Sequence, residues 1–498
     1  MPTESFFTQA SLAYLASAGA GKDGKAYSIK PTDGTGDFTF SRGSNLAATR
    51  VGADGLIEKG RENLLLQSNA FNVSPWLNQL GTGTITSGQT GYDGTNDAWE
   101  ITKDTSTSRS VRQPISSSGV LTYSVYVKAG TLNDAALRVD TTAGAAQVLF
   151  DLTDGSSTLV GGTVISHDSV DIGLGWYRLI VIVNATITNV HIYVDRDGTT
   201  AGSIYIQDSQ LEIGLAATEV IESGATTGKA GLLEDEPRFD YSGGATCPSL
   251  LLEPSRTQYI QYTEYLDPST SWSGFPSADP VTHTQNYAIA PDGTKTASLL
   301  GNFTSGGINI VNNSNYRTST DVTQNPLDGA YTMSVWLKTT SGAGTISLLN
   351  RGLSSGTNAP QLLQCNVTNE WQRFDVSNTY TAAENASSLG FTIIKGNPDT
   401  LEEVLVWGAQ MEAGSYPTSY IPNHSGGTIT RGWDGSTTGD ISSLVNSPEG
   451  TIFTDCAKIQ GVPYFSLFLL DDGTSNNRIT LYTRDNTTQL TFILTIGG

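Results

Sequence analysis

The chain has 498 residues, of which 54 are glycine and only 15% are charged, and its formal net charge is −21 with a pI near 4.5. This charge repels a nucleic-acid phosphate backbone and no cluster of Lys and Arg offsets it, which argues against DNA or RNA binding. No stretch approaches the roughly 18 consecutive apolar residues of a membrane span, and the first residues lack the basic and apolar segments of an export signal, so we expect a soluble chain.

Residues 1–60 form a separate opening segment. A short apolar start (Phe6 to Leu15) is followed by strand and turn patterns up to the sequence DGLIEKG. The apolar residues are too few for an independent core. We therefore predict an attachment segment that is completed by another chain or by the domain that follows it.

The next part of the chain contains two copies of one module, residues 61–224 and residues 255–424, joined by a linker at 225–254. Five landmarks recur in the same order, roughly 195 to 210 residues apart. They are NLLLQSNAFNVSPW with QYIQYTEYLDPSTSW, DG with DG, YSVYVK with MSVWLK, GWYR with EWQR, and QLEIGLAATEVI with QMEAGSYPTSYI. A repeated module of this size favours binding or architecture over catalysis.

Short apolar runs with period-two alternation, such as TYSVYVK and SIYIQ, predict β-strands throughout both modules. No segment has sustained helical periodicity, so the predicted fold class is all-β. Residues 425–498 contain further strand patterns, and a third β unit is expected to start near Glu449. About 50 residues are too few for a complete sandwich, so we expect that the natural chain continues or that another subunit completes this sheet.

The motifs FTFSRGSNLAATRV, DGLIEKGRENLLLQSNAF, SVYVK, GWYR and the closing QLE segment together resemble structural proteins of tailed bacteriophages. The likeness is to fibre and spike-like proteins of phages that infect Bacteroidetes, crAss-like phages included, and it covers essentially the whole chain. It implies that each module is a jelly roll like a carbohydrate-binding module, and that residues 425–498 open a concanavalin A-like domain. It also implies a homotrimer located in the virion and assembled in the bacterial cytoplasm. The chain departs from the pattern at Gln258, where the family motif has Asn.

Positions kept in both copies are predicted to serve the shared fold. The tryptophan pairs are expected in the core, and the glutamate pair is expected to hold the last strand or a shared turn. These positions are Trp76 with Trp272, Trp176 with Trp371, and Glu212 with Glu412.

Strand alternation places Tyr126 and Lys128 on one face of the SVYVK strand, and places Trp336 and Lys338 on the matching face of the second copy. An aromatic ring beside a lysine suits stacking on a sugar while its hydroxyls are hydrogen-bonded. These four residues are the predicted glycan-binding candidates. The alternative is that the rings pack beneath a long loop or against a neighbouring subunit.

No catalytic or metal-binding pattern stands out. The four histidines (His167, His191, His283, His424) are scattered singly, and the three cysteines (Cys247, Cys365, Cys456) form no CxxC pair. Acidic turns at 151–155, 195–198 and 470–473 supply oxygens of the kind that calcium requires, but turn formation explains the same residues. We expect no enzyme activity and no cofactor. A structural calcium is implied only by the family resemblance, and its ligands are unknown.

Three functions follow. The first is a phage fibre or spike protein whose opening segment docks on other virion proteins and whose repeated modules bind a bacterial surface polysaccharide with added avidity. The second is an architectural virion protein that binds only other virion proteins. The third is a capsule depolymerase, which would need two carboxylates about 5 to 10 Å apart across a sugar.

Overall fold

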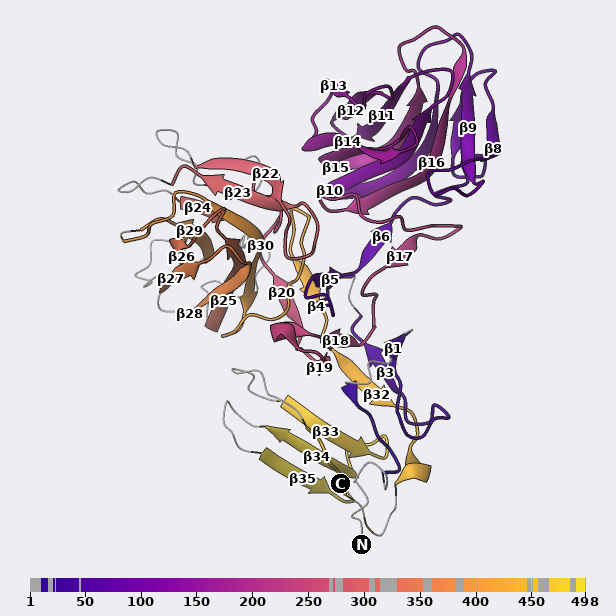
Figure 1. The fold of residues 1–498 in the computed structure, drawn as a ribbon. Helices are drawn as coiled ribbons and strands as arrows, with labels where there is room; N and C mark the ends of the chain where they lie inside the picture. Colours follow the sequence, from indigo (N-terminus) through magenta and orange to yellow (C-terminus); the bar gives the residue numbers. More distant parts are fainter. Residues whose placement is uncertain are drawn as a thin grey trace.

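The structure is a computed structural model in which an all-β chain forms two sandwich modules on a common stem (Figure 1). In the described residues the only helical elements are the 3-10 turns η2 (Ser242–Gly244) and η4 (Ser442–Leu444), and none of them could cross a membrane. The described residues are 10–16, 21–22, 24–43, 46–267, 272–273, 281–303, 310–313, 329–352, 361–381, 389–396, 398–445, 449, 451–455, 465–483 and 490–497.

Module 1 is a sandwich of two antiparallel sheets that share two long, bent strands. The first half of β10 and the last half of β15 belong to one sheet with β7, β11, β12 and β13. In the second sheet the other half of β10 pairs with β16, the other half of β15 pairs with β14, and β9 and β8 follow β16 in order. The bounds are β7 (Leu77–Gln79), β8 (Ile85–Gln89), β9 (Ala98–Lys103), β10 (Ser110–Ala129), β11 (Asp134–Thr141), β12 (Gly144–Asp151), β13 (Ser157–Gly161), β14 (Ser166–Gly173), β15 (Trp176–Val194) and β16 (Gly202–Ile213).

Module 2 repeats this arrangement with five strands in each described sheet. Sheet β22-β23-β30-β25-β28 matches β8-β9-β16-β10-β15, and sheet β21-β24-β29-β26-β27 matches β7-β10-β15-β11-β12. The two-sheet sandwich and the duplication predicted from the sequence are therefore confirmed. The bounds are β21 (Trp272–Ser273), β22 (Thr282–Ala288), β23 (Ala297–Gly301), β24 (Ile310–Asn313), β25 (Gly329–Lys338), β26 (Gly344–Gly352), β27 (Gln361–Val367), β28 (Gln372–Tyr380), β29 (Leu389–Ile394) and β30 (Val404–Ala413).

Each module has its own apolar core between its two sheets. In module 1 the inward faces of β10, β11, β12 and β15 supply residues such as Val125, Leu137, Val148 and Ile192, all without solvent exposure. Because side chains alternate along a strand, every inward residue leaves its neighbour on the outer face. Module 2 has the equivalent core around Trp272, which is also fully buried.

A short strand before each module pairs with a short strand after it. In module 1, β6 (Arg61–Asn63) pairs with β17 (Gly228–Ala230), and in module 2, β20 (Arg256–Gln258) pairs with β31 (Ile429–Arg431). These closing strands lie a few residues beyond the predicted module ends at 224 and 424.

The opening segment builds a stem with segments from elsewhere in the same chain. Its strand β3 pairs with β32 from beyond module 2, and Ile57 of β5 packs with Trp407 and Tyr420 of module 2. The described apolar side chains of this segment thus pack against the linker and module 2 rather than module 1, while its attachment to another chain stays a prediction. The stem strands are β1 (Gly21–Lys22), β2 (Lys25–Ala26), β3 (Phe38–Ser41), β4 (Thr49–Val51), β5 (Ile57–Lys59), β18 (Arg238–Asp240), β19 (Ser249–Leu251) and β32 (Gly435–Thr438).

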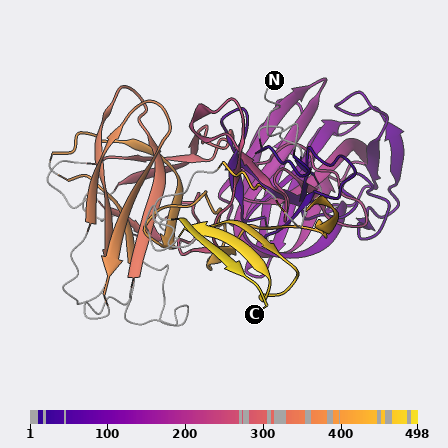
Figure 2. The same ribbon diagram turned by 90° about the horizontal axis from the view of Figure 1, so that it is seen from below.

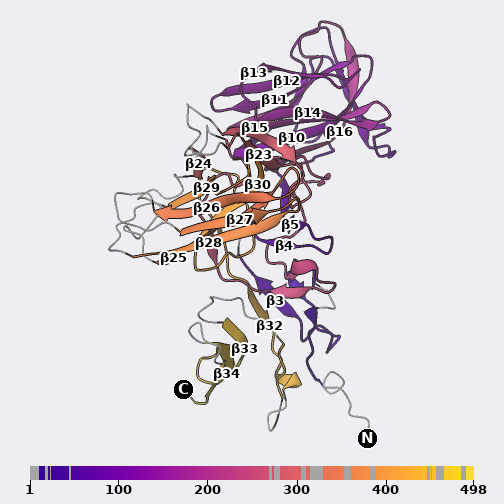
Figure 3. The ribbon, with the colours of Figure 1, turned by 60° about the vertical axis from the view of Figure 1, so that its left-hand side comes forward.

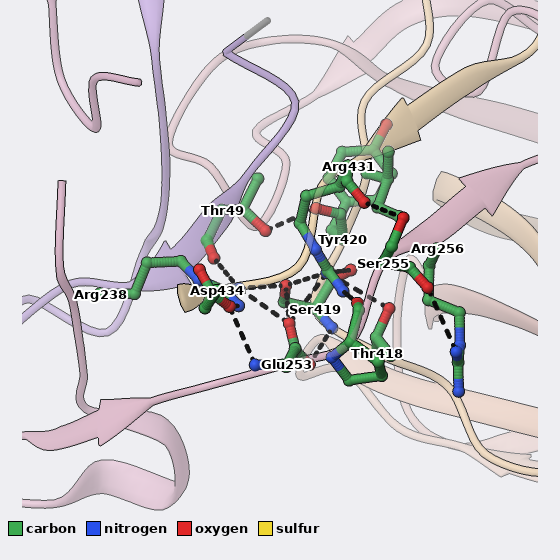
Figure 4. Close-up of polar contacts among 12 residues, drawn as sticks. Thr49, Arg238, Glu253, Ser255, Arg256, Thr418, Ser419, Tyr420, Arg431 and Asp434 are labelled. Atoms are coloured by element: carbon green, nitrogen blue, oxygen red, sulfur yellow. Dashed lines mark hydrogen bonds and ion pairs between the residues drawn. The ribbon is translucent and has the colours of Figure 1, made fainter. Parts of the chain in front are cut away.

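A buried ionic network joins the stem to module 2 (Figure 4). Glu253 of the linker lies 2.8 Å from Nη1 of Arg238 and 2.8 Å from Nη1 of Arg431, and Asp434 bonds Arg238 as well as Arg42. The side chains of all five residues are at most 4% exposed. Three arginines and two carboxylates from the opening segment, the linker and the segment after module 2 are thus held together.

The two modules also contact each other directly, and they lie side by side when viewed from below (Figure 2). Val120, Ile182 and Leu215 of module 1 pack with Tyr265 of module 2, and the Val120 amide donates to the carbonyl of His424 at 2.9 Å. The modules are therefore fixed to each other by both apolar and backbone contacts.

Beyond the stem lies a three-stranded antiparallel sheet made of β33 (Phe465–Asp471), β34 (Arg478–Thr483) and β35 (Leu490–Thr495) (Figure 3). These strands match the β patterns expected in residues 425–498. Cys247 and Cys365 are free thiols, and Cys456 lies outside the described residues.

Candidate functional site

The predicted glycan-binding ring of module 1, Tyr126, is buried, with 7% of its surface exposed. One face stacks on Tyr92 with ring centroids 3.9 Å apart, and the guanidinium group of Arg178 lies 5.2 Å from the ring centroid. Trp176 and Val220 pack in the same cluster. The Tyr126 ring therefore packs among other side chains of module 1.

Trp336 of module 2 has an equivalent environment. The guanidinium group of Arg373 lies 4.4 Å from its ring centroid, and Trp407 and Tyr420 meet the ring edge-on at 5.4 and 5.6 Å. Lys128 and Lys338 are half-buried near the ends of their strands. Both modules match the alternative in which the rings pack beneath another segment. Glycan contact by Tyr126, Lys128, Trp336 and Lys338 stays a prediction.

The covering segment follows the last long strand of each module and is fastened by the repeated glutamate. Glu212 accepts a hydrogen bond from the Thr218 amide at 3.0 Å, and Glu412 accepts one from the Thr418 amide at 2.7 Å. Arg178 and Arg373 donate to the carbonyls of these same threonines. The predicted structural role of the glutamate pair is confirmed.

The repeated tryptophans also serve the fold. Trp76, Trp176 and Trp272 are at most 5% exposed, and Trp371 is half-buried against the cluster of Trp407 and Tyr420. The predicted structural role of the tryptophan pairs is therefore confirmed.

The acidic turns use their carboxylates to bind backbone amides. Asp151 accepts from the Thr153 amide, Asp195 from the Gly198 amide, and Asp472 from the Thr474 amide. This is the turn geometry expected for such residues. Within the ranges described above, no group of three or more His, Cys, Asp or Glu could hold a metal ion.

A different surface of module 1 gathers polar side chains on one sheet. Val190, Ile192 and Val194 of β15 point into the core, so Asn189, His191 and Tyr193 lie on the outer face. The same alternation on the neighbouring strands puts Arg112 (β10), Arg138 and Asp140 (β11), and Gln147 (β12) on this face. We call these seven residues the polar face.

Strand register brings four of them into one row across the sheet. His191 pairs with Arg112 on one side and with Arg138 on the other, and Arg138 pairs with Gln147. Adjacent strands lie about 4.8 Å apart, so the row extends over about 14 Å. That length suits a ligand that is extended rather than compact.

The polar face is held by its own hydrogen bonds. Nε2 of His191 lies 2.9 Å from Oδ2 of Asp140, Nε of Arg138 donates to Oδ1 of the same carboxylate at 2.7 Å, and Arg112 donates to Asn189 at 2.7 Å. The rings of His191 and Tyr193 stack with centroids 5.6 Å apart. The side chains are therefore oriented before any ligand arrives.

The protonation states follow from these contacts. Burial raises the pKa of the Asp140 carboxyl, but hydrogen bonds from Arg138 and His191 outweigh burial and lower it. Burial lowers the pKa of His191 despite the hydrogen bond that its ring donates to Asp140. At neutral pH the face thus presents two guanidinium groups, one carboxylate and a neutral imidazole.

The surroundings give this face both a recess and an apolar rim. A shallow hollow of about 390 Å³, lined by Pro114, Ile115, Ser116 and Thr188, lies beside Asn189, which pairs with Pro114. Leu77 of β7 pairs with Arg112 and is 41% exposed. Planar polar groups beside exposed apolar carbon can bind hydroxyl-rich rings, whose edges are polar and whose faces are apolar.

Module 2 does not repeat the row. Its equivalent pairing is Thr392 with Leu349 and Leu349 with Leu362, and Leu362 is 61% exposed. The two modules share the fold but differ on this face.

Sequence reasoning missed the polar face because it treated His191 as an isolated residue without an acid-base partner. The alternation of NVHIYV and ALRVD, with polar residues at every second position, was available as a signal. Only the structure shows which strands are neighbours and in which register they pair.

Comparison with known proteins finds no matching protein-family model and no matching curated protein. Among solved structures, the chain is similar to the tandem CBM22 domains of Xyn10C from Paenibacillus barcinonensis, at 10% identity and a TM-score of 0.24, over 75% of this chain and 99% of that one. It is also similar to the xylan-binding CBM22-2 domain of that enzyme (12% identity, TM-score 0.19, 30% and 96%) and to a CBM4 structure (13%, 0.20, 30% and 99%). These neighbours are carbohydrate-binding modules with β-sandwich folds, and the values carry no argument about the ligand of this chain.

Proposed function

We propose that this chain is a non-enzymatic glycan-binding protein whose polar face on module 1 contacts the sugar. The resemblance of its motifs to phage fibre and spike-like proteins supports a finer proposal. In it, the chain belongs to a virion, attaches to other virion proteins through residues 1–60, forms a homotrimer and binds a bacterial surface polysaccharide during host adhesion.

The row Arg112, His191, Arg138 and Gln147 carries the proposal. Its members come from four adjacent strands, and hydrogen bonds orient Arg112, Arg138 and His191. His191 and Gln147 are only 6% and 5% exposed, so the half-buried Arg112 and Arg138 are the members open to a ligand. Polar side chains on a sandwich face cost stability when they are half-buried, so their presence on one copy only favours a binding role over a fold requirement.

A second candidate is a purely architectural virion protein. It is favoured by the apolar side chains of the three-stranded sheet, where Phe492 and Leu494 of β35 are 63% and 55% exposed. Alternation puts these two residues on one face, and exposed apolar patches of this kind mark protein contacts. This candidate assigns no ligand to the polar face.

The test is a polysaccharide array probed with the full chain and with two double variants. We expect the wild type to bind at least one glycan, Asn189→Ala with Gln147→Ala to weaken that binding, and Lys128→Ala with Lys338→Ala to leave it unchanged. Each double variant removes two polar side chains from a strand face, so the second is a matched control for the first.

Loss in the lysine variant alone would move the site to the residues first predicted from the sequence. No binding to any glycan would favour the architectural candidate, and shortening of the polysaccharide chains during incubation would indicate a depolymerase.

A further inference from the structure

Two arginines of the polar face lie on either side of one histidine. Arg112 pairs with His191 from β10, and Arg138 pairs with it from β11. Burial is the main cause of the lowered pKa of His191, and the positive charges of Arg138 and Arg112 lower it further. Both guanidinium groups are therefore within electrostatic reach of the same ring.

The charges on this face do not cancel. Asp140 is the one carboxylate among the seven residues of the polar face, and it bonds to both Arg138 and His191. With a neutral imidazole, two guanidinium groups and one carboxylate leave a local excess of one positive charge. The chain as a whole carries −21, so this excess is opposite in sign to the net charge of the chain.

Both guanidinium groups also have donors to spare. Each has five N–H donors. In the described part of the chain, Arg112 donates to Oδ1 of Asn189, and Arg138 donates to Oδ1 of Asp140 and faces the Tyr193 hydroxyl. The remaining N–H groups are directed at no carboxylate of this chain that the structure describes.

We infer that the polar face takes an acidic glycan, in which carboxylate or sulfate groups on the sugars bind Arg112 and Arg138; this rests on the proposed glycan-binding function. A guanidinium group matches a carboxylate or sulfate with two parallel hydrogen bonds, which a neutral hydroxyl cannot offer. Asn189, which is half-buried on the same face, is left to bind a ring hydroxyl.

The negative net charge of the chain restricts the expected binding of an acidic glycan to the polar face. A polyanion is repelled by a chain that has 48 acidic and 27 basic residues. The matching row of module 2, with Leu349, Leu362 and Thr392, offers no charge. Binding of an acidic polysaccharide must therefore depend on Arg112 and Arg138 rather than on general attraction.

The experiment measures affinity of the full chain for polygalacturonate, alginate and hyaluronan, each beside its carboxyl-reduced form, with a sulfated glycan and a set of neutral glycans in parallel. We expect binding to at least one acidic polymer and at least about a tenfold loss when its carboxyl groups are reduced. Preference for the sulfated glycan over the carboxylated ones would identify sulfate as the source of the anion.

Three variants test the residues, and a fourth, Arg50→Gln, is the control. Arg112→Gln and Arg138→Gln are each expected to weaken acidic-glycan binding at least about tenfold, whereas Arg50→Gln, which removes the same charge from the stem hairpin, should not. Asp140→Asn is expected to strengthen binding, because it removes the one carboxylate that competes for Arg138. A residue needed only for folding would not give opposite effects in the arginine and aspartate variants.

Binding to neutral glycans alone, or binding that survives carboxyl reduction and both arginine variants, would overturn this inference and leave the proposed function standing. Absence of binding to every glycan in the panel would overturn the proposed function as well.

Discussion

Asn63 and Gln258 make the same four hydrogen bonds in the two modules, although their side chains differ by one methylene. Asn63 donates to the carbonyls of Ser209 and Ile221 and accepts from the amides of Leu65 and Leu211. Gln258 donates to the carbonyls of Ala409 and Ile421 and accepts from the amides of Ile260 and Met411. Both are fully buried. The replacement of Asn by Gln between the two copies therefore preserves the contact that ties the first strand of the module to the last.

This relationship predicts module-specific effects. Asn63→Ala and Gln258→Ala each leave buried backbone groups without a partner, so each should cost at least about 2 kcal/mol of stability. Hydrogen exchange of the intact chain should show lost protection in β16 for the first variant and in β30 for the second. The exposed Asn184→Ala serves as a control. Unchanged protection in both strands would contradict the shared role.

Removing one charge from the buried ionic network between the stem and module 2 should strongly lower the stability of the protein. Glu253→Gln removes the charge that Arg238 and Arg431 share, so it should destabilise the junction by about 3–5 kcal/mol. Glu58→Gln breaks the partly exposed pair with Arg50 and should cost less than about 1 kcal/mol. The midpoints of thermal unfolding of the two variants compare these costs directly. Equal midpoints would mean that the network does not hold the stem to module 2.

The burial and ion pairs of Glu253 also predict how the stability of the protein depends on pH. Burial raises the pKa of Glu253, but the charges of Arg431 and Arg238 outweigh burial and lower it to about 2 from an ordinary value of 4.5. The folded pKa is lowered, so the stabilisation is complete above the ordinary value and is lost as the pH falls from 4.5 towards 2. Urea unfolding midpoints across this range should fall more steeply for the wild type than for Glu253→Gln. Parallel curves would count against an ionised Glu253.

Substitutions of Tyr126 can show whether its ring serves the fold or binds a glycan. Tyr126→Ala removes the ring that stacks on Tyr92, so it should cost about 3 kcal/mol, whereas Tyr126→Phe keeps the ring and should cost less than about 1 kcal/mol. Glycan affinity per folded molecule should stay unchanged in both variants. A Tyr126→Ala protein of normal stability that no longer binds glycan would restore the sequence-based prediction.

The sequence was sufficient for the fold because strand periodicity and the repeat are local signals. The alternation of Tyr123, Val125 and Val127 correctly identified the core face of β10. The opposite face could not be judged in the same way, because the segment around Val220 that covers Tyr126 lies far along the chain. The polar face was missed for a similar reason, since Asp140 and His191 meet only through the pairing of β11 with β15. Contacts between distant segments depend on register and on closing strands, which composition does not encode.

The most direct test of the central claim is binding of the labelled full chain to intact Bacteroidetes cells, with purified capsule as competitor. The account predicts binding that capsule competes away, that is lost when Arg112 and Arg138 are both replaced by Gln, and that persists when Arg50 is replaced by Gln. Absence of cell binding, or binding that the double variant retains in full, would contradict a glycan-binding role for the polar face of module 1.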